Sequence, residues 1–402
     1  MLSQARLARL RNQLDASARQ ADAYVRAYMA AFRSEYPEAG VAEVRELAKS
    51  AIADALSVFG DQAAEVAGQL FDELAAEAGQ DATAAIFDTI DPSEVDRKVR
   101  WLARRLADGD YPGFEGSVRD LTRYYVRRQA FENMARNCEA RRVRYARVPS
   151  GTETCAFCFM LCSRGFVYKS ERTAGVGHQY HDHCDCVIVP GFGGGDQDHQ
   201  VEGYEPSGMY ERWKACARTA DVDADEALGN PELRRRVLDE VETRDWRWLY
   251  SGEEPEVSYG GWSARDKRKL AEQEKWEHAF LAKNGFPIFP IPTDRAAPAN
   301  IDLWMSGELW ELKSVTGDVR RVGQRIDEAV SKWDRLHEAG LSIGSVPKVI
   351  VDNTRGRSSD DDVAAEMRKK MIKYAEKGFD EAYLIRRDNT ILHIRSEAQA
   401  RE

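Results

Sequence analysis

The sequence predicts a multidomain protein with an all-α N-terminal region, a small cysteine- and histidine-rich module, and a C-terminal α/β domain. Three observations predict it. Apolar residues recur near a 3.6-residue period through about the first 145 residues. Five of the seven cysteines fall between positions 155 and 186. After about residue 260, short apolar runs alternate with amphipathic helical stretches, which is the pattern of an α/β domain.

The length and composition set the domain limits. A chain of 402 residues is too long for one ordinary core, so two or three domains are expected. We expect a helical region over 1–147, the cysteine-rich module over 148–190, a linker with a short helical segment over 191–262, and the α/β domain over 263–402. The linker is glycine-rich at its start, in GFGGGDQDHQ. No apolar run could span a bilayer and the N-terminus lacks a secretory signal, so no membrane partner is expected.

The charge is distributed unevenly along the chain. The net charge of −10 argues against a general nucleic-acid coat. Residues 263–402 hold 25 Lys+Arg and 24 Asp+Glu, a net of +1, which leaves 33 and 44, a net of −11, for the rest. The acidic excess therefore lies outside the C-terminal domain.

The helical region contains four amphipathic stretches, at 41–59, 61–79, 91–108 and 117–148. The second closes on Gly79, a common helix stop, and the third opens at Pro92-Ser93. We expect the fourth, which is rich in arginine near its end, to form one long helix.

The cysteine-rich segment predicts a structural zinc site, because two short ligand groups about 25 residues apart suit tetrahedral coordination. A segment with so few apolar residues would also need the folding free energy that zinc supplies. The preferred ligands are Cys155, Cys158, His181, Cys184 and Cys186. The ligand set stays open, because other candidates are present: Cys162, His178 and His183. The alternative is a set of reduced thiols.

The C-terminal domain is predicted to contain three helices and a small sheet. The helices are expected over 266–285, 319–340 and 360–378, and a strand over 347–353. Hairpins are expected over 301–314 and over 382–396, the second turning at Asp388-Asn389.

The hairpin over 301–314 carries charges among residues that favour burial. With Ser306-Gly307 as its turn, the facing pairs are Met305 and Glu308, Trp304 and Leu309, Leu303 and Trp310, and Asp302 and Glu311. Opposed like charges are destabilising, and Lys313 shares a face with Glu311. A divalent cation between the two carboxylates would turn repulsion into ligation. The alternative is a solvated face with a cross-strand salt bridge.

The N-terminal half resembles the minor head proteins of tailed phages, the family of the phage Mu F protein. The resemblance rests on the arginine-rich stretch, then CAFCFMLCSRGFVY, then HDHCDCVIVP, and covers about residues 1–200. It implies a virion protein inside the capsid, present near the portal and partnered by capsid or portal proteins.

The C-terminal domain resembles the PD-(D/E)xK nucleases, and in particular the tRNA nuclease domains that end contact-dependent growth inhibition toxins. The resemblance rests on EKWEHAFLAKNG, ANID, WELKS and KVIVDN. It implies an endonuclease acting in the host cytoplasm on RNA, tRNA foremost, with an immunity protein as partner. Asp302 and Glu311 would hold Mg²⁺, with Lys313 at the scissile phosphate.

The resemblance leaves several roles open. Glu277 or Glu274, one helical turn apart, would complete the metal site or orient Lys313. His278 and His393 are further acid–base candidates, above all if the RNA 2′-hydroxyl attacks without a metal. Two other functions stay open: a purely structural minor head protein with an inactive C-terminal domain, and a DNA endonuclease.

Overall fold

The computed structural model describes residues 1–150, 154–169, 186–192, 200–244, 257–260, 262–264, 267, 270–294, 296–341 and 345–396. It divides into two compact units, Met1–Tyr210 and Glu211–Glu402. The first is mostly helical and the second contains a sheet, as the sequence predicts.

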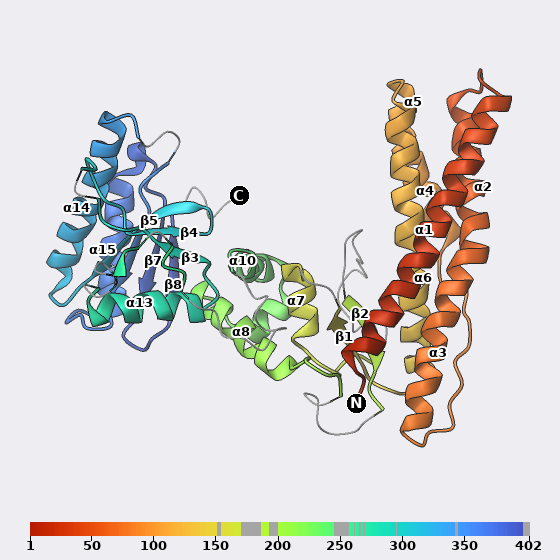
Figure 1. Ribbon diagram of the computed structural model, residues 1–402, viewed down its shortest axis with the longest axis horizontal. Helices are drawn as coiled ribbons and strands as arrows, with labels where there is room; N and C mark the ends of the chain where they lie inside the picture. The colour runs from red at the N-terminus through yellow and green to blue at the C-terminus, as the bar shows by residue number, and fades with distance from the viewer. Residues whose placement is uncertain are drawn as a thin grey trace. The chain divides into compact units, whose positions relative to one another are not determined.

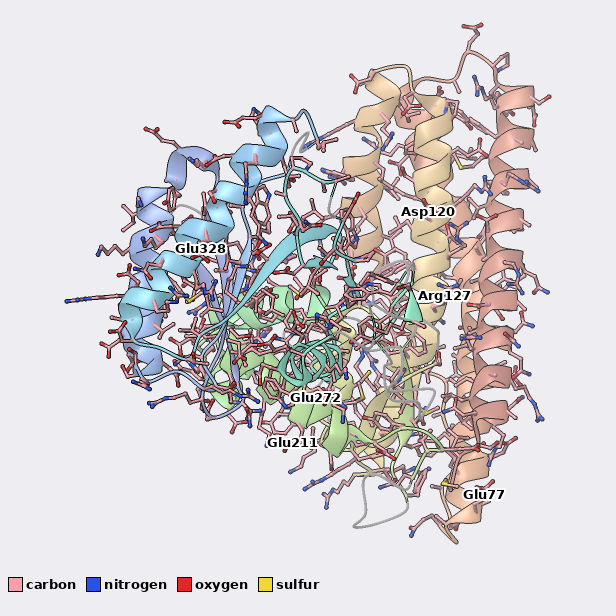
Figure 2. The ribbon with its side chains drawn as sticks, turned by 60° about the vertical axis from the view of Figure 1, so that its left-hand side comes forward. Glu77, Asp120, Arg127, Glu211, Glu272 and Glu328 are labelled. Carbon is pink, nitrogen blue, oxygen red and sulfur yellow. The ribbon has the colours of Figure 1, made fainter. Side chains whose placement is uncertain are left out.

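Helices dominate the first unit, and three long ones run alongside one another (Figure 1): α1 (Gln4–Glu35), α3 (Asp61–Glu77) and α6 (Tyr111–Ala140). Alanines such as Ala18, Ala21 and Ala67 are buried along them, which lets the helices approach closely. Figure 2 labels Asp120 and Arg127 along α6. The shorter elements are α2 (Val41–Ala55), the π-helix η1 (Leu56–Gly60), α4 (Pro92–Leu102), α5 (Arg104–Ala107) and α7 (Ala156–Cys162).

The fourth amphipathic stretch ends earlier than the sequence predicts. Helix α6 stops at Ala140, and Arg142 adopts a φ of 55° just after it. Residues Tyr145–Pro149 then form strand β1, which pairs antiparallel with β2 (Cys186–Pro190). The single long helix over 117–148 is therefore wrong at its end, because a strand about 40 residues away supplies backbone partners that local periodicity cannot reveal.

The second unit is a six-stranded sheet with helices on both faces. Its strands are β3 (Ile288–Pro290), β4 (Leu303–Met305), β5 (Glu308–Ser314), β6 (Val349–Asp352), β7 (Glu381–Ile385) and β8 (Ile391–Arg395). They lie in chain order; β5, β6 and β7 are parallel, and the other neighbours are antiparallel. Its helices are α8 (Pro206–Thr219), which begins in the first unit, α9 (Ala224–Gly229), α10 (Pro231–Glu242), α13 (Glu272–Lys283), α14 (Val319–Glu338), α15 (Asp360–Lys373) and the 3₁₀ helix η3 (Ala375–Lys377).

Side-chain alternation divides this sheet between two cores. Val349 and Val351 of β6 face α14 and α15, in a core with Ile326 and Met367. Ile350 faces α13, in a second core whose other members include Leu281, Leu303, Met305, Trp310 and Tyr383. On β5, the odd-numbered residues therefore face α14 and the even-numbered residues face α13. None of the described helices combines the length and apolarity needed to cross a membrane.

The second unit begins at Glu211, within the stretch 191–262 for which the sequence predicts a linker. Helix α10 packs on the sheet through ion pairs. The buried His393 of β8 contacts Glu240 of α10, and Arg395 Nη1 lies 3.3 Å from Asp239 Oδ2. Near the β4–β5 turn, Ser306 Oγ donates to the Thr243 carbonyl at 2.9 Å.

Candidate functional site

The β4–β5 hairpin has the predicted register. Leu303 pairs with Trp310, Trp304 with Leu309 and Met305 with Glu308. The turn residues have φ of 51° for Ser306 and 86° for Gly307. Positive φ at both central positions matches the twist of the flanking strands, so this turn sets the register of the charged residues that follow.

Asp302 lies where this ladder ends. Its Oδ2 accepts a hydrogen bond from the Leu312 N–H at 2.9 Å, in place of a backbone carbonyl of β4. The same oxygen lies 3.8 Å from Lys313 Nζ. On its other edge, β5 pairs with β6, where the Glu311 N–H donates to the Lys348 carbonyl at 3.0 Å. Asp302 and Glu311 are thus not a ladder pair, but both contact Lys313.

Glu311 is fully buried and bridges two lysines. The Nζ atoms of Lys313 and Lys332 both donate to its Oε1. Its Oε2 is buried and has no hydrogen-bond partner within the described part of the chain. Burial, followed by the nearby Asp302 carboxylate, raises the pKa of Glu311 to about 7, against the opposing effect of the lysines. The carboxyl therefore exchanges its proton near neutral pH.

Lys332 is the residue that sequence reasoning missed. It lies on α14, and its Nζ also donates to the Asn300 carbonyl at 2.7 Å. One sequence signal points to it. Lys332 is three residues after Ala329 and four before Leu336, both buried, so helical spacing directs it toward the sheet.

The second lysine adds a positive charge that the hairpin alone does not supply. With all four groups ionised, Asp302 and Glu311 carry two negative charges, and Lys313 and Lys332 carry two positive charges. Charge balance alone does not require a metal ion. The site instead presents two ammonium groups that converge on one buried carboxylate oxygen.

The two helix glutamates behave differently. Glu274 is exposed, and its Oε2 accepts the Ala271 N–H at 2.8 Å, which caps α13. Glu277 is buried and accepts a hydrogen bond from Ser314 Oγ, on the face of β5 opposite Glu311 and Lys313. Neither glutamate joins the two lysines within the described residues. Figure 2 labels Glu272 at the start of α13 and Glu328 on α14, the helices that carry Glu277 and Lys332.

Glu277 instead belongs to a second buried cluster. Gln273 Nε2 donates to Asp352 Oδ2 at 2.6 Å and lies 3.3 Å from Glu277 Oε1. Burial first, and then the Asp352 carboxyl, raise the pKa of Glu277 to about 8. At neutral pH the Glu277 carboxyl is therefore mostly protonated. Asp352 lies in KVIVDN, one of the stretches on which the resemblance to the toxin nucleases rests, but sequence reasoning assigned it no role.

The side chains of both candidate histidines are buried and hydrogen-bonded within the second unit. Burial lowers the pKa of His278 to about 4, and its Nδ1 lies 3.1 Å from the Tyr259 hydroxyl. Burial also lowers the pKa of His393, but hydrogen bonds to Glu240 and Glu381 raise it above its ordinary value. His393 joins α10 to the sheet through these carboxylates.

The cysteine cluster is described in part. Cys158 Sγ lies 3.6 Å from Cys186 Sγ, and both side chains are buried. Cys155 caps α7, where its Sγ accepts the Cys158 N–H at 3.3 Å. The Arg147 guanidinium donates to Cys186 Sγ at 2.9 and 3.2 Å. His181 and Cys184 lie outside the described residues, and among those described no three His, Cys, Asp or Glu side chains form a metal-binding group.

Comparison with known proteins identifies the family from the N-terminal half. Residues 1–216, more than half of the chain, match the family described as VG15 protein. The chain belongs to the VG15 protein family. This is a family of viral proteins, and the more specific resemblance to the phage Mu F protein stays a prediction.

Two further comparisons concern single proteins. No curated protein matches the chain. Among solved structures, the chain is similar to the CdiA-CT/CdiI toxin and immunity complex from Burkholderia pseudomallei, with 18% identity over 35% of this chain and 95% of that chain, and a TM-score of 0.24.

Proposed function

We propose that this viral protein carries an endonuclease in its second unit, which cleaves the phosphodiester bonds of RNA, tRNA foremost. The observation that supports it is the convergence of Lys313 and Lys332 on the buried Glu311, with Asp302 beside them. A buried charge is costly to maintain, so a fully buried carboxylate between two partly exposed lysines favours a catalytic site over a stabilising ion pair.

The chemistry follows from these side chains. Phosphodiester cleavage places additional negative charge on the phosphate oxygens in the transition state. Lys313 and Lys332 would bind those oxygens, and both are already held at one point by Glu311. Glu311, whose pKa is about 7, is suited to accept the proton of the attacking hydroxyl, which is either water or the RNA 2′-hydroxyl. Asp302 is the more exposed carboxylate and would keep Lys313 oriented toward the substrate.

We also propose a catalytic Mg²⁺ held by Asp302 and Glu311. The donor set fits a hard cation, because Glu311 Oε2 is a buried carboxylate oxygen without a partner among the described groups. When bound, the ion would acidify a water molecule and stabilise charge on the phosphate. Lys332 competes for the same carboxylate, so dependence on Mg²⁺ must be measured.

For the first unit we propose a structural zinc. Zn–S bonds of about 2.3 Å hold two sulfurs roughly 3.8 Å apart in a tetrahedral site. The 3.6 Å separation of Cys158 and Cys186 fits this value, and the Arg147 guanidinium would offset thiolate charge. We propose His181 and either Cys155 or Cys184 as the remaining ligands.

Membership of a viral family supports a role for the first unit in the virion. We propose that it attaches to capsid or portal proteins inside the particle, and that the nuclease acts in the host cytoplasm. An immunity protein would then protect the producing cell. Sedimentation of the protein with purified particles, and its absence from particles emptied of their contents, tests the location.

The activity is tested by incubating the full chain with total RNA and with plasmid DNA, with Mg²⁺ or with EDTA. We expect RNA cleavage that Lys313→Ala abolishes. Lys377→Ala, which removes a half-exposed lysine paired with Asp334, is the matched control and should cleave normally. The ends of the products identify the nucleophile, because attack by the 2′-hydroxyl leaves a cyclic phosphate.

Other outcomes contradict the proposal in distinct ways. Cleavage of plasmid alone would identify a DNA endonuclease. Intact RNA and DNA under all conditions, with a folded protein, would leave a structural virion component with an inactive C-terminal domain.

A further inference from the structure

Two aromatic side chains are exposed next to the candidate site. Phe289 of β3 and Trp304 of β4 are direct cross-strand partners. Their exposed fractions are 52% and 44%. Single exposed apolar side chains are common on protein surfaces, but an adjacent pair of large aromatic rings often marks a binding surface.

Strand alternation puts this pair on the same face as the lysines. Leu303 and Met305 are buried in the core under α13, so Trp304 points to the opposite face of β4. Trp304 pairs with Leu309, which is two residues before Glu311 on β5. Phe289, between the buried Ile288 and Pro290, projects to this face as well. Two residues along a strand span about 7 Å, so Trp304 begins about that far from Asp302.

We propose that Phe289 and Trp304 form a base-stacking subsite for unpaired nucleotides beside the scissile phosphate. Proteins bind single strands by stacking bases on aromatic rings while positive groups bind the backbone. Here the positive groups are Lys313 and Lys332, and the rings lie on the same face. A base inside a duplex already stacks on its neighbours, so the subsite selects RNA that is single-stranded at the cut. This inference rests on the proposed nuclease function.

The first experiment measures steady-state cleavage of a single-stranded oligoribonucleotide and of the same strand annealed to its complement. With the full chain, Trp304→Ala should raise KM for the single strand about tenfold and leave kcat nearly unchanged. Trp304→Phe keeps an aromatic ring and should restore most of the affinity. Trp101→Ala, which removes an exposed tryptophan from α4 of the first unit, is the matched control and should behave like the wild type.

The second experiment separates this inference from the proposed function. A fluorescent single-stranded oligodeoxynucleotide lacks the 2′-hydroxyl, and its binding is measured by anisotropy in EDTA. Binding that weakens about tenfold in Trp304→Ala supports the subsite, whether or not the wild type cleaves RNA. A wild type that binds the oligonucleotide in this way but cleaves no RNA would refute the nuclease function and leave the subsite supported.

Two results would overturn the subsite. One is a wild type that cleaves RNA while Trp304→Ala and Phe289→Ala keep its KM. The other is equal cleavage of single strand and duplex. If either alanine variant misfolds by circular dichroism, Trp304→Phe and Phe289→Leu are compared instead: stacking predicts normal binding for the first and weakened binding for the second. Weakened binding in neither would also overturn the subsite.

Discussion

Glu311→Gln tests whether burial raises the pKa of the carboxylate at the centre of the candidate site. The ordinary pKa of a glutamate is 4.5, and in the folded protein that of Glu311 is about 7. Between these values the folded state binds more protons at this carboxyl than the unfolded state. The free energy of unfolding therefore falls as the pH rises from 4.5 to 7, by about 3 kcal/mol. Gln cannot ionise, so Glu311→Gln lacks this fall.

The expected result is that the difference in free energy of unfolding between Glu311→Gln and the wild type changes with pH. The free energy of unfolding of Glu311→Gln minus that of the wild type should rise by about 3 kcal/mol between pH 4 and pH 8. Groups distant from Glu311 cancel, because they titrate alike in both proteins. Urea titrations followed by tryptophan fluorescence suit the measurement, since eight of the nine tryptophans lie after residue 210, in the second unit.

A matched control removes a carboxylate from the same strand without burial. Glu308 is half-exposed and paired with Lys348, so Glu308→Gln reports the effect of losing one surface charge. A difference for Glu311→Gln that stays constant from pH 4 to pH 8 would refute the raised pKa. A difference that falls with pH would mean that Lys313 and Lys332 stabilise the carboxylate more than burial destabilises it.

Three further predictions concern other groups. Lys332→Met keeps the aliphatic stem but removes the ammonium group. We expect RNA cleavage to fall at least about a hundredfold with an unchanged circular dichroism spectrum. Normal cleavage would show that this lysine is purely structural. Cys186→Ser should lower the zinc content measured by mass spectrometry from about one ion per chain to none. Cys138→Ser, which changes a buried thiol of α6, is the control and should keep the zinc. Equal zinc in both variants would exclude Cys186 as a ligand. His393→Ala should lower the free energy of unfolding by about 2 kcal/mol, because Glu240 and Glu381 each lose a hydrogen bond to His393, while Arg244 and Lys348 stay beside them. Since the pKa of His393 is raised, that loss should be full below pH 6.5 and shrink as the pH rises above it, and a loss independent of pH would show that the histidine is neutral throughout.

The register of the β4–β5 hairpin could be derived from the sequence because a two-residue turn determines its own pairing. Once Ser306-Gly307 is the turn, the three pairs of the β4–β5 ladder follow by counting, and alternation assigns Glu311 and Lys313 to one face. These properties depend on the local backbone. The second hairpin differs from a two-residue turn at Asp388-Asn389. Ile385 pairs with Ile391 and the Arg386 N–H donates to the Thr390 carbonyl, so its loop has three residues, and counting from two turn residues would shift the register by one.

The partners of these side chains were decided only by packing between elements. Helical periodicity makes Glu274 and Glu277 equal candidates for the site, because they lie one turn apart on the same face. The packing of α13 on the sheet buries Glu277, whereas Glu274 caps the start of the helix. Alternation along β5 then separates Glu277 from Lys313. Glu277 accepts a hydrogen bond from Ser314, and Ser314 lies on the face of β5 opposite Lys313.

Lys332 shows most directly that tertiary packing, and not local sequence, selects the partners of Glu311. It follows Glu311 by 21 residues, and no turn or repeat links them; the two meet because α14 crosses from β5 to β6 and returns over the sheet. Local conformation is set by steric limits on neighbouring residues, so sequence determines the hairpin and the faces of its strands. The ionic state of Glu311 is set by how deeply it is buried and by which charges other elements bring to it, and those depend on the complete tertiary structure.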